Sequence, residues 1–535
     1  MKDAADQVKT SCEPAALEAH AGVVKAKIKV TFPEKFFHPE AVLELLPVVK
    51  YDGGELPLPA YVKMLQGEKV KDNYAVIPEK TGGGYEQELL FNFNDSLKVS
   101  QLMLRATLIL KDGVRLPILD RKLADGVVAT YKQAEVAAVP AFSEDAYVKT
   151  STLSKNAEIK FVINQAAVRP AELSKEDVKL LQNFLIEASK DSKKTLKGLS
   201  ISSYASPDGT TTLNEKLSAN RGKTSTDALN SQLQKSKVKL DGKLVAVEHT
   251  AEDWDGFQEL MAASDIQDKD LVLRVLSMYN DPDVREREIK NIAAVYKVIA
   301  DKILPDLRRS KLEATVEIDN LGDDEIKALV DAGTFDKLSI EQLLYAGNTL
   351  YTEDADKEKV FKAASALNDF RAWNNLGAIY LKQGKTDDAK AALESAQALN
   401  GNDAKVKNNL GYVLLLAGGK TAEADLLLAS AGLDESKQGL AYIAIQKGQY
   451  AQAVTLTKGS KTVNEALAQL LNGNLDEASS VLADLDTPKA SYLKAIVGAR
   501  KNSEADVLDN LNKAGDLKAA AKTDAEFAAF WPKIQ

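Results

Sequence analysis

The residues best suited to binding chemistry lie in one stretch, from Tyr204 to Arg221. Ser-Pro-Asp-Gly at residues 206–209 has the composition of a turn, because proline presets one φ angle and glycine accepts a positive one. The residues from Asn214 to Arg221 are predicted to open a helix. A helix start presents unpaired backbone N–H groups, which favour carboxylates and other anions. The stretch either binds an anionic ligand with Arg221 or is only the strand end, turn and helix start of a scaffold.

Nucleophilic and metal-binding side chains are scarce elsewhere. The 535 residues include one cysteine, Cys12, and three histidines that are far apart in sequence. One cysteine excludes an internal disulfide and a CxxC metal site. No GxxxxGK[ST], GxSxG or HExxH motif occurs, and the carboxylate-rich stretches lack the DxDxDG spacing of a calcium loop, so solvated loop charge is the simpler explanation for them. We therefore expect no enzyme activity, no cofactor and no metal.

The charge and hydropathy of the chain narrow its partners and its location. The net charge of −9 gives no basic field for phosphate backbones, so nucleic acid is not an expected partner. No apolar run approaches the ~20 residues that span a bilayer. The first residues lack the apolar region of a signal peptide, so an export signal would have to lie outside this sequence. Val8-Lys9-Thr10-Ser11 before Cys12 is a poor lipobox, so we expect a loose surface thiol, with a lipid anchor (lipoprotein) as the alternative.

The elements that position these residues fall into several regions, the first of them rich in strands. We expect residues 1–22 to be a flexible segment and residues 23–150 to form a β-sandwich. From Lys25 to Phe32 polar and apolar residues alternate, and the same period returns from Leu102 to Leu110. Turn-rich stretches with several glycines separate these strands. Short strands at such spacing are typical of a sandwich.

Strands and helices alternate from residue 157. Ile159, Phe161 and Ile163 share one strand face, and a helical pattern follows from Val178 to Leu185. A second strand near Leu199 then leads into the stretch that contains Arg221. This order predicts an α/β domain whose turn and helix carry the candidate site.

This region resembles the OmpA-like domain, the family that binds peptidoglycan in the envelopes of diderm bacteria. The family pattern has a Gly-His/Tyr-Thr-Asp turn, a glycine, and then Asn-x-x-Leu-Ser-x-x-Arg-Ala, with glycine here in place of the alanine. Asp306 to Ile318 resembles the Asn-Arg-Arg-Val-Glu-Ile final strand of the family. The resemblance covers residues 155–320, and the matching residues are Tyr204, Gly209, Asn214, Leu217, Ser218 and Arg221.

The resemblance implies a site for the zwitterionic end of diaminopimelate. In the family an arginine binds the carboxylate and an aspartate binds the ammonium group. The arginine aligns with Arg221, whereas Ser206 stands where the aspartate is expected, and Asp208 two residues later is the substitute. An insertion at about residues 245–303 is expected to roof or reshape the cleft. Two alternatives therefore stay open: the domain binds peptidoglycan, or it keeps the fold of the family but has lost or changed its ligand. The implied ligand-binding residues are Tyr204, Ser206, Asp208, Asn214, Ser218 and Arg221.

The C-terminal region is helical and repetitive. A linker helix is predicted within residues 321–338, and a repeat domain over 339–535. Leu410-Gly411 repeats Leu376-Gly377 after 34 residues, which is the period of the tetratricopeptide family, and the stretch around it resembles that family. Turn glycines recur five residues before small alanines. Glycine allows the turn between the two helices of a repeat, and alanine lets these two helices approach closely. The repeat-packing residues are Trp373, Leu376, Gly377, Tyr380, Gly384, Ala389, Gly448, Ala453, Gly473 and Ala478.

Such arrays present an extended concave face to partners, although repeats can also act as a spacer. A large residue at Gly384 or Ala389 is expected to wedge two helices apart. The other domains should survive that change, because few contacts should cross the linkers.

The sequence therefore predicts a multidomain α+β protein: a β-sandwich, an OmpA-like α/β sandwich with a helical insertion, and an all-α tetratricopeptide solenoid. We expect a periplasmic, outer-membrane-associated scaffold that holds peptidoglycan through the middle domain and envelope proteins through the repeats. Any membrane contact would be made through an anchor or a partner. The alternative is a protein-only adaptor of an outer-membrane assembly or secretion machine that no longer binds peptidoglycan.

Overall fold

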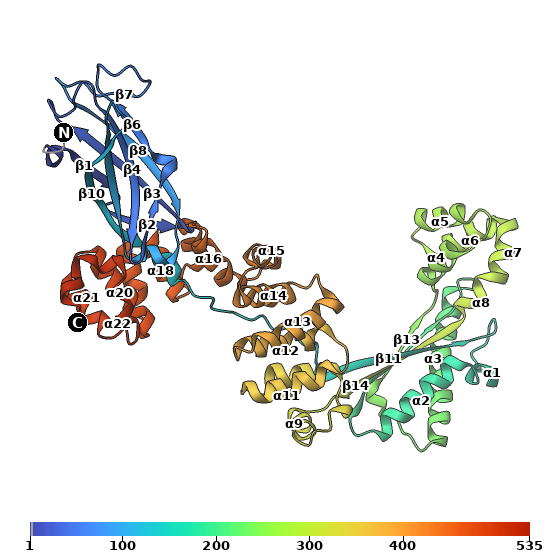
Figure 1. The fold of residues 1–535 in the computed structure, drawn as a ribbon. Coiled ribbons are helices and arrows are strands. Elements are labelled where there is room, and N and C mark those ends of the chain that lie inside the picture. Colours follow the sequence, from blue (N-terminus) through green and yellow to red (C-terminus); the bar gives the residue numbers. More distant parts are fainter. Residues whose placement is uncertain (2–3, 535) are drawn as a thin grey trace. The chain divides into compact units, whose positions relative to one another are not determined.

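The structure, a computed structural model, describes residue 1 and residues 4–534 and divides into two compact units. The first unit contains residues 1–145 and 339–535, and the second contains residues 146–338 (Figure 1). The chain thus leaves the first unit, forms the second and returns. The second unit ends at Leu338, where the predicted linker region also ends.

The N-terminal strands of the first unit form one ten-stranded sheet, in which β2 pairs with both β3 and β10. The sheet order is β1-β3-β2-β10-β9-β4-β6-β7, with β8 paired to β3 and β5 to β4. Apolar residues of β3 and β9 alternate inward and are buried, as their period predicts. The strands are β1 (Lys9–Glu13), β2 (Ala16–His20), β3 (Val23–Phe32), β4 (Val42–Tyr51), β5 (Gly54–Pro57), β6 (Lys63–Gln66), β7 (Ala75–Val76), β8 (Gly83–Asn92), β9 (Ser100–Ile109) and β10 (Arg115–Val128).

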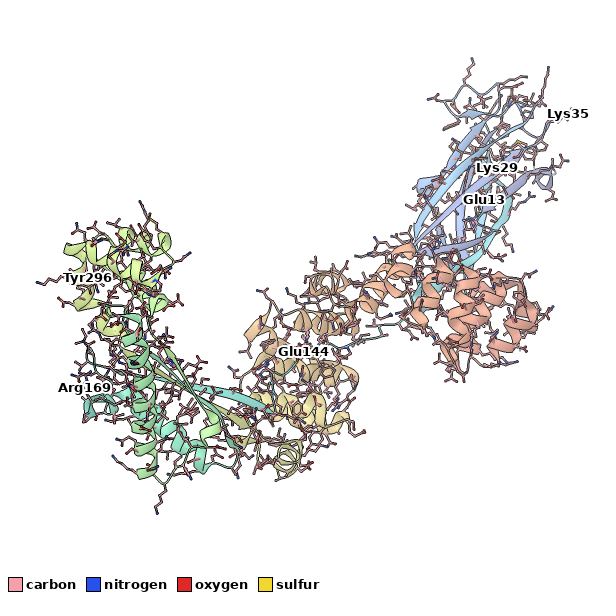
Figure 2. The ribbon with its side chains drawn as sticks, turned by 180° about the vertical axis from the view of Figure 1, so that it is seen from behind. Glu13, Lys29, Lys35, Glu144, Arg169 and Tyr296 are labelled. Atoms are coloured by element: carbon pink, nitrogen blue, oxygen red, sulfur yellow. The ribbon has the colours of Figure 1, made fainter. Side chains whose placement is uncertain are left out.

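The prediction of a flexible segment at residues 1–22 was wrong for the strands that begin at Lys9, whereas residues 2 and 3 lie outside the described residues. Strand β1 pairs antiparallel with β3 from Lys9↔Thr31 to Glu13↔Lys27, and β2 continues the sheet. The outward residues of β1 are polar and exposed, so the sequence shows no apolar alternation that would predict a strand there. Glu13 of β1 and Lys29 of β3 are exposed residues of this outer face (Figure 2). Cys12 is half-buried against the core, and burial raises the pKa of its thiol to about 11, so it is not a loose surface thiol.

The C-terminal region of the first unit is a stack of paired helices. Positive φ angles of 71° at Gly384 and 69° at Gly448 close two of the turns between helices. The helices are α10 (Ile340–Tyr345), the π-helical η7 (Ala346–Leu350), α11 (Asp354–Ser365), α12 (Phe370–Lys382), α13 (Thr386–Asn400), α14 (Ala404–Ala417), α15 (Thr421–Ala431), α16 (Ser436–Gln446), α17 (Tyr450–Thr457), α18 (Val463–Leu471), α19 (Leu475–Ala483), α20 (Pro488–Arg500), α21 (Glu504–Leu511), α22 (Leu517–Ala520) and η8 (Ala525–Lys533).

The sandwich and the last repeats form one body, so the predicted independence of these two domains was wrong. A single hydrophobic core joins strand residues such as Leu17 to helix residues such as Ile445 and Phe527. Polar contacts add to it: Nδ1 of His20 lies 2.7 Å from the hydroxyl of Tyr450. The sandwich also ends earlier than residue 150, because β10 ends at Val128 and residues 134–145 run as an extended segment.

The second unit is a four-stranded sheet covered by two helices. The sheet order is β11-β14-β12-β13, in which β14 is antiparallel to both neighbours and β12 is parallel to β13. Helices α2 and α3 bury apolar residues against the sheet. The elements are β11 (Thr150–Lys160), α1 (Pro170–Leu173), α2 (Glu176–Lys190), β12 (Lys194–Tyr204), α3 (Thr211–Lys235), β13 (Val245–Thr250), β14 (Arg309–Asp319) and α9 (Asp323–Asp331).

The helical insertion is shorter than the predicted residues 245–303. Strand β13 at its predicted start belongs to the sheet, where Leu199 pairs with Val245. Its residues are mostly exposed because it is an edge strand, so it carries little apolar pattern. The inserted helices have a core of their own around Phe257, Met261 and Ile299. They are α4 (Trp254–Ala263), α5 (Lys269–Met278), α6 (Pro282–Asn291), α7 (Ala293–Lys302) and α8 (Leu304–Leu307).

Candidate functional site

Residues 134–145, which we call the strap, run as an extended segment along the helices of the solenoid (Figure 1). The strap contacts the first helix of three repeats, namely α18, α14 and α12. Its main chain forms no helix or strand, so its N–H and C=O groups need other partners. Asparagine side chains of these helices provide them.

Two asparagines each hold one strap residue through two hydrogen bonds. The Ala141 N–H donates to Oδ1 of Asn409 at 2.8 Å, and Nδ2 of Asn409 donates to the Ala141 carbonyl at 2.8 Å. Asn375 binds Ser143 in the same way, at 2.6 and 2.9 Å. All four residues are buried. Alternate residues of an extended chain are bound, so the helices recognise one edge of its main chain.

Two further asparagines complete the network at the centre of the strap. Nδ2 of Asn374 donates to the Ala141 carbonyl at 3.0 Å, and its Oδ1 accepts from Asn409 at 2.9 Å. Nδ2 of Asn408 donates to the carbonyl of Val139 at 3.0 Å. Each amide therefore supports its neighbour as well as the strap. We call Asn374, Asn375, Asn408, Asn409 and Asn464 the asparagine row.

The ends of the strap show its direction. Asn464 exchanges two hydrogen bonds with Glu135, at 3.0 and 2.7 Å. At the other end Nδ2 of Asn348 donates to the carboxylate of Asp145 at 3.2 Å. The strap therefore runs antiparallel to the order of the repeats, from α18 back to the first helices.

The side chains of the strap add shape and charge to this recognition. Ala141 and Ser143 are only 2% and 3% exposed, so larger side chains would not fit there. The ring of Phe142 lies 6.4 Å from that of Phe361. Nζ of Lys405 lies 3.0 Å from the carboxylate of Glu144, which projects at the solenoid (Figure 2). The site thus takes small residues at two alternate positions, an aromatic residue between them and an acidic residue next.

The sequence analysis did not identify the asparagine row, although the sequence contains a signal for it. Asn-Asn-Leu-Gly occurs at residues 374–377 and again at 408–411, one repeat later. Two polar residues on a helix that is otherwise buried need hydrogen-bond partners. Their repetition at the period of the array indicates that one extended ligand meets both helices.

The predicted repeat-packing residues lie between the paired helices. Leu376, Ala389, Ala453 and Ala478 are buried. Trp373 and Tyr380 are partly buried against the core that contains Ala389. A Cβ atom on Gly377 would lie 2.5 Å from Cγ of Leu393, so this glycine is required for close approach. A Cβ atom on Gly384 would have no atom within 4 Å, so the predicted wedge at this position was wrong. Gly384 and Gly473 are turn residues with positive φ.

The predicted ligand arginine of the second unit is buried and bonded to main chain. Helix α3 begins at Thr211, so Arg221 lies about three turns inside the helix. The sequence analysis had predicted that Arg221 lies at the helix start. Nε, Nη1 and Nη2 donate to three carbonyls, those of Gln165, Tyr204 and Val162, at 3.1, 2.8 and 3.4 Å. Burial lowers the pKa of Arg221 to about 10, with Arg308 adding to the effect. Arg221 therefore ties helix α3 to the loop after β11 and to the end of β12.

Asp208 is paired with an arginine that the sequence analysis did not include in the site. Nη2 of Arg308 donates to Oδ2 of Asp208 at 3.0 Å, and the Ser206 hydroxyl donates to Oδ1 at 2.6 Å. Nε of Arg308 also donates to Ser206 at 3.1 Å. The Asp208 and Arg308 side chains are 13% and 11% exposed. Ser206 and Asp208 thus bond to each other and to Arg308 rather than to Arg221.

Of the remaining predicted residues, only Asn214 is described in contact with this loop. Nδ2 of Asn214 donates to the carbonyls of Ser206 and Gly209 at 3.3 and 3.1 Å. Ser218 is buried and donates to the Glu215 carbonyl within its own helix. The side chain of Tyr204 stacks near Arg309, 5.6 Å from its guanidinium carbon.

The inserted helices approach the same loop. Thr211 at the start of α3 lies 3.5 Å from a carboxylate oxygen of Asp283 on α6. Burial raises the pKa of the Tyr296 hydroxyl on α7 (Figure 2), and Asp208 adds to this rise, whereas Lys290 and Arg308 oppose it. The insertion therefore lies near the Asp208–Arg308 pair, and its predicted role as a roof over a ligand cleft stays a prediction.

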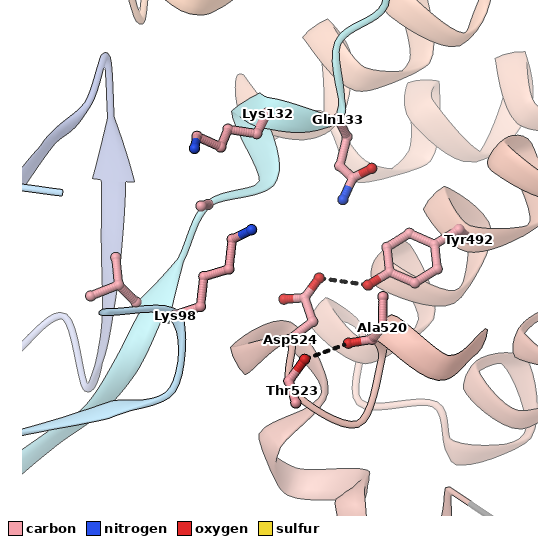
Figure 3. A pocket seen from close by; sticks show the side chains of 9 residues that line it. Lys98, Lys132, Gln133, Tyr492, Ala520, Thr523 and Asp524 are labelled. Atoms are coloured by element: carbon pink, nitrogen blue, oxygen red, sulfur yellow. Dashed lines mark hydrogen bonds between the residues drawn. The ribbon is translucent and has the colours of Figure 1, made fainter. Parts of the chain in front are cut away.

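A small cavity of about 120 Å³ lies where the sandwich meets the last helices (Figure 3). Inside it the Tyr492 hydroxyl donates to Asp524 at 2.7 Å, and Lys98 and Lys132 line the other side. In residue 1 and residues 4–534 no three His, Cys, Asp or Glu side chains are placed to hold a metal ion. None of the helices in that same part of the chain is long and apolar enough to span a membrane.

Comparison with known proteins identifies the repeats. The tetratricopeptide repeat family model matches residues 370–403, which are α12, α13 and their turns. No curated protein matches the chain. Among solved structures, it is similar to a tetratricopeptide repeat protein from Parabacteroides merdae, with 10% identity, 38% of this chain and 91% of that chain covered, and a TM-score of 0.28. It is also similar to PilF of Pseudomonas aeruginosa, with 15% identity, 40% and 100% covered, and a TM-score of 0.29.

The C-terminal helices of the first unit therefore contain a tetratricopeptide repeat, as the glycine and alanine pattern predicted. Repeats of this kind indicate a scaffold for protein–protein interaction.

Proposed function

We propose that this protein is a non-enzymatic, protein-binding scaffold of the bacterial periplasm, associated with the outer membrane. The asparagine row carries the proposal, because it is a built site for the main chain of an extended polypeptide. The resemblance of residues 155–320 to the OmpA-like domain supports the compartment. The lack of nucleophilic and metal-binding motifs supports a role without catalysis.

Two versions of this scaffold differ in the second unit. In the first version the unit anchors the protein to peptidoglycan, with Arg221 on the carboxylate and Asp208 on the ammonium group of diaminopimelate. In the second version the protein is an adaptor that binds proteins only. The hydrogen bonds of Arg221 to three carbonyls and the pairing of Asp208 with Arg308 favour the adaptor, because both charges already have partners.

Binding to purified sacculi separates the two versions. We expect the wild-type protein to stay in the supernatant when sacculi are pelleted, and calorimetry with a diaminopimelate-containing muropeptide to give no heat. The Ser206→Asp and Arg308→Met variants test whether the family's aspartate or a released Asp208 restores binding. Heat with wild type that is lost in Arg221→Ala would establish the peptidoglycan anchor instead.

The location is tested by fractionation of the native host cell. We expect the protein in the envelope fraction, sedimenting with outer membranes and released by mild detergent. Recovery of the full-length protein in the cytosol would contradict the proposed compartment and leave the binding function to be tested separately.

A further inference from the structure

The strap differs from an ordinary core segment in how it is held. Its central residues are bound through main-chain groups to side-chain amides, and none of these bonds belongs to a helix or sheet that includes the strap. A separate peptide in the same extended conformation would make the same bonds. The exchange of one such segment for another therefore breaks and remakes an equal number of hydrogen bonds.

The side-chain contacts define which peptide fits. Two buried positions accept only small residues, here Ala141 and Ser143, and the residue between them faces an aromatic ring. Acidic residues follow, where Lys405 and Asn348 receive Glu144 and Asp145. Nζ of Lys489 lies 3.9 Å from Glu135 at the other end, so cationic or amide groups meet acidic residues at both ends.

We propose that the asparagine row is a binding site for an extended segment of a partner protein, which the strap occupies in cis until the partner displaces it. The partner segment has the pattern small, aromatic, small, acidic, acidic. This inference rests on the proposed protein-binding function and names the partner's chemistry. The strap acts as a built-in competitor, with an effective concentration of about 1 mM. A partner present at about 10 μM must then bind the open row roughly 100-fold more tightly than the strap to occupy half of it.

Fluorescence anisotropy with the full-length protein tests the exchange. The probe is a dye-labelled peptide with the sequence of residues 134–146. Ala141→Arg places a long charged side chain at a buried strap position and should expel the strap, whereas Ala137→Arg is the matched control at an exposed strap position. We expect the Ala141→Arg protein to bind the probe at least tenfold more tightly than wild type or the control. Adding Asn375→Ala and Asn409→Ala should abolish that gain.

Two outcomes would overturn the proposal. One is an Ala141→Arg protein that keeps its helical circular dichroism and binds the probe no better than wild type. The other is an Ala141→Arg protein that loses its solenoid, because the strap is then a permanent part of the fold.

Hydrogen exchange on the wild-type protein tests the same point without a variant. If the strap opens by itself, the amides of Ala141 and Ser143 should exchange at least 100-fold faster than buried helix amides such as that of Ile379. Exchange of the strap and helix amides at one common rate would contradict the proposal. A partner that is captured through the outer surface of the repeats would leave the scaffold function standing while this inference failed.

Discussion

The asparagine row of the first unit and a cluster in the second unit, Arg221, Arg308 and Asp208, which we call the arginine cluster, both bury side chains of the kind that bind ligands. The row uses neutral amides, and its partner is a strap that lies 232 to 329 residues away in sequence. The cluster uses charges, and its partners are an arginine and carbonyl groups of the same unit. A neutral amide can exchange one main-chain partner for another, whereas a buried charge must keep a counterpart at all times. The comparison therefore predicts an exchangeable site in the first unit and a fixed one in the second.

The largest effect is expected from breaking the Asp208–Arg308 pair. Arg308→Met leaves a buried carboxylate without its cation, which typically costs about 3 to 5 kcal/mol of unfolding free energy. Urea unfolding followed by Trp254 measures this, with Trp373 and Trp531 changed to phenylalanine so that only the second unit reports. Arg287→Met, at a side chain that is 64% exposed, is the control. Asp208→Asn added to Arg308→Met should restore most of the loss. A loss below about 1 kcal/mol in Arg308→Met alone would contradict the claim that the buried charge must keep its counterpart.

A smaller loss is expected from the row itself. Asn409→Ala leaves the buried N–H of Ala141 without a partner and removes one of two donors to its carbonyl, which costs about 2 to 3 kcal/mol in the first unit. Asn402→Ala, at an exposed loop position, is the matched control. Denaturation followed by Trp373, with Trp254 and Trp531 changed to phenylalanine, gives both values. If the two variants are equally stable, the strap does not depend on the row.

The spacing of the helices that carry the row can be disturbed without touching an asparagine. Gly377→Ala places a methyl group 2.5 Å from Leu393 and should cost about 1 to 3 kcal/mol by overpacking. Gly384→Ala meets no atom within 4 Å, but its φ of +71° should cost about 1 kcal/mol by backbone strain. Thermal unfolding ranks the two variants. A larger loss at Gly384 would mean that turn geometry, and not helix approach, limits the solenoid.

The smallest effect is expected at the rim of the strap site. Glu144 is 89% exposed, so Lys405→Ala should change the unfolding free energy of the first unit by less than about 1 kcal/mol. A double-mutant cycle with Glu144→Ala measures the coupling of the pair. Coupling well above that value would mean that charge, rather than the amide bonds, holds the strap.

The sequence predicted the elements whose pattern is local. The alternation from Lys25 to Phe32 became β3, and the glycine and alanine period of the repeats became the paired helices. These patterns are visible because one face of each element is buried and the other is not.

The sequence did not predict the features that depend on distant partners. The strap has no period, since its main chain is satisfied by asparagines of the solenoid. The polar strand β1 was missed for a similar reason, because β3 supplies its hydrogen bonds. In the second unit the residue types around Arg221 were found, but their partners were not. Arg308 lies 100 residues from Asp208, and no local spacing connects the two.

The strap ends at one of the two points where the chain passes between the units. It ends where Asp145 bonds to Asn348, close to the point at which the chain returns to the solenoid. On the side of the second unit, the Asn320 side chain donates to the carbonyl of Val148 at 2.8 Å, so the outgoing and returning chains are again neighbours. The two units are therefore joined by two stretches of chain, and a cut at either one leaves them covalently connected through the other.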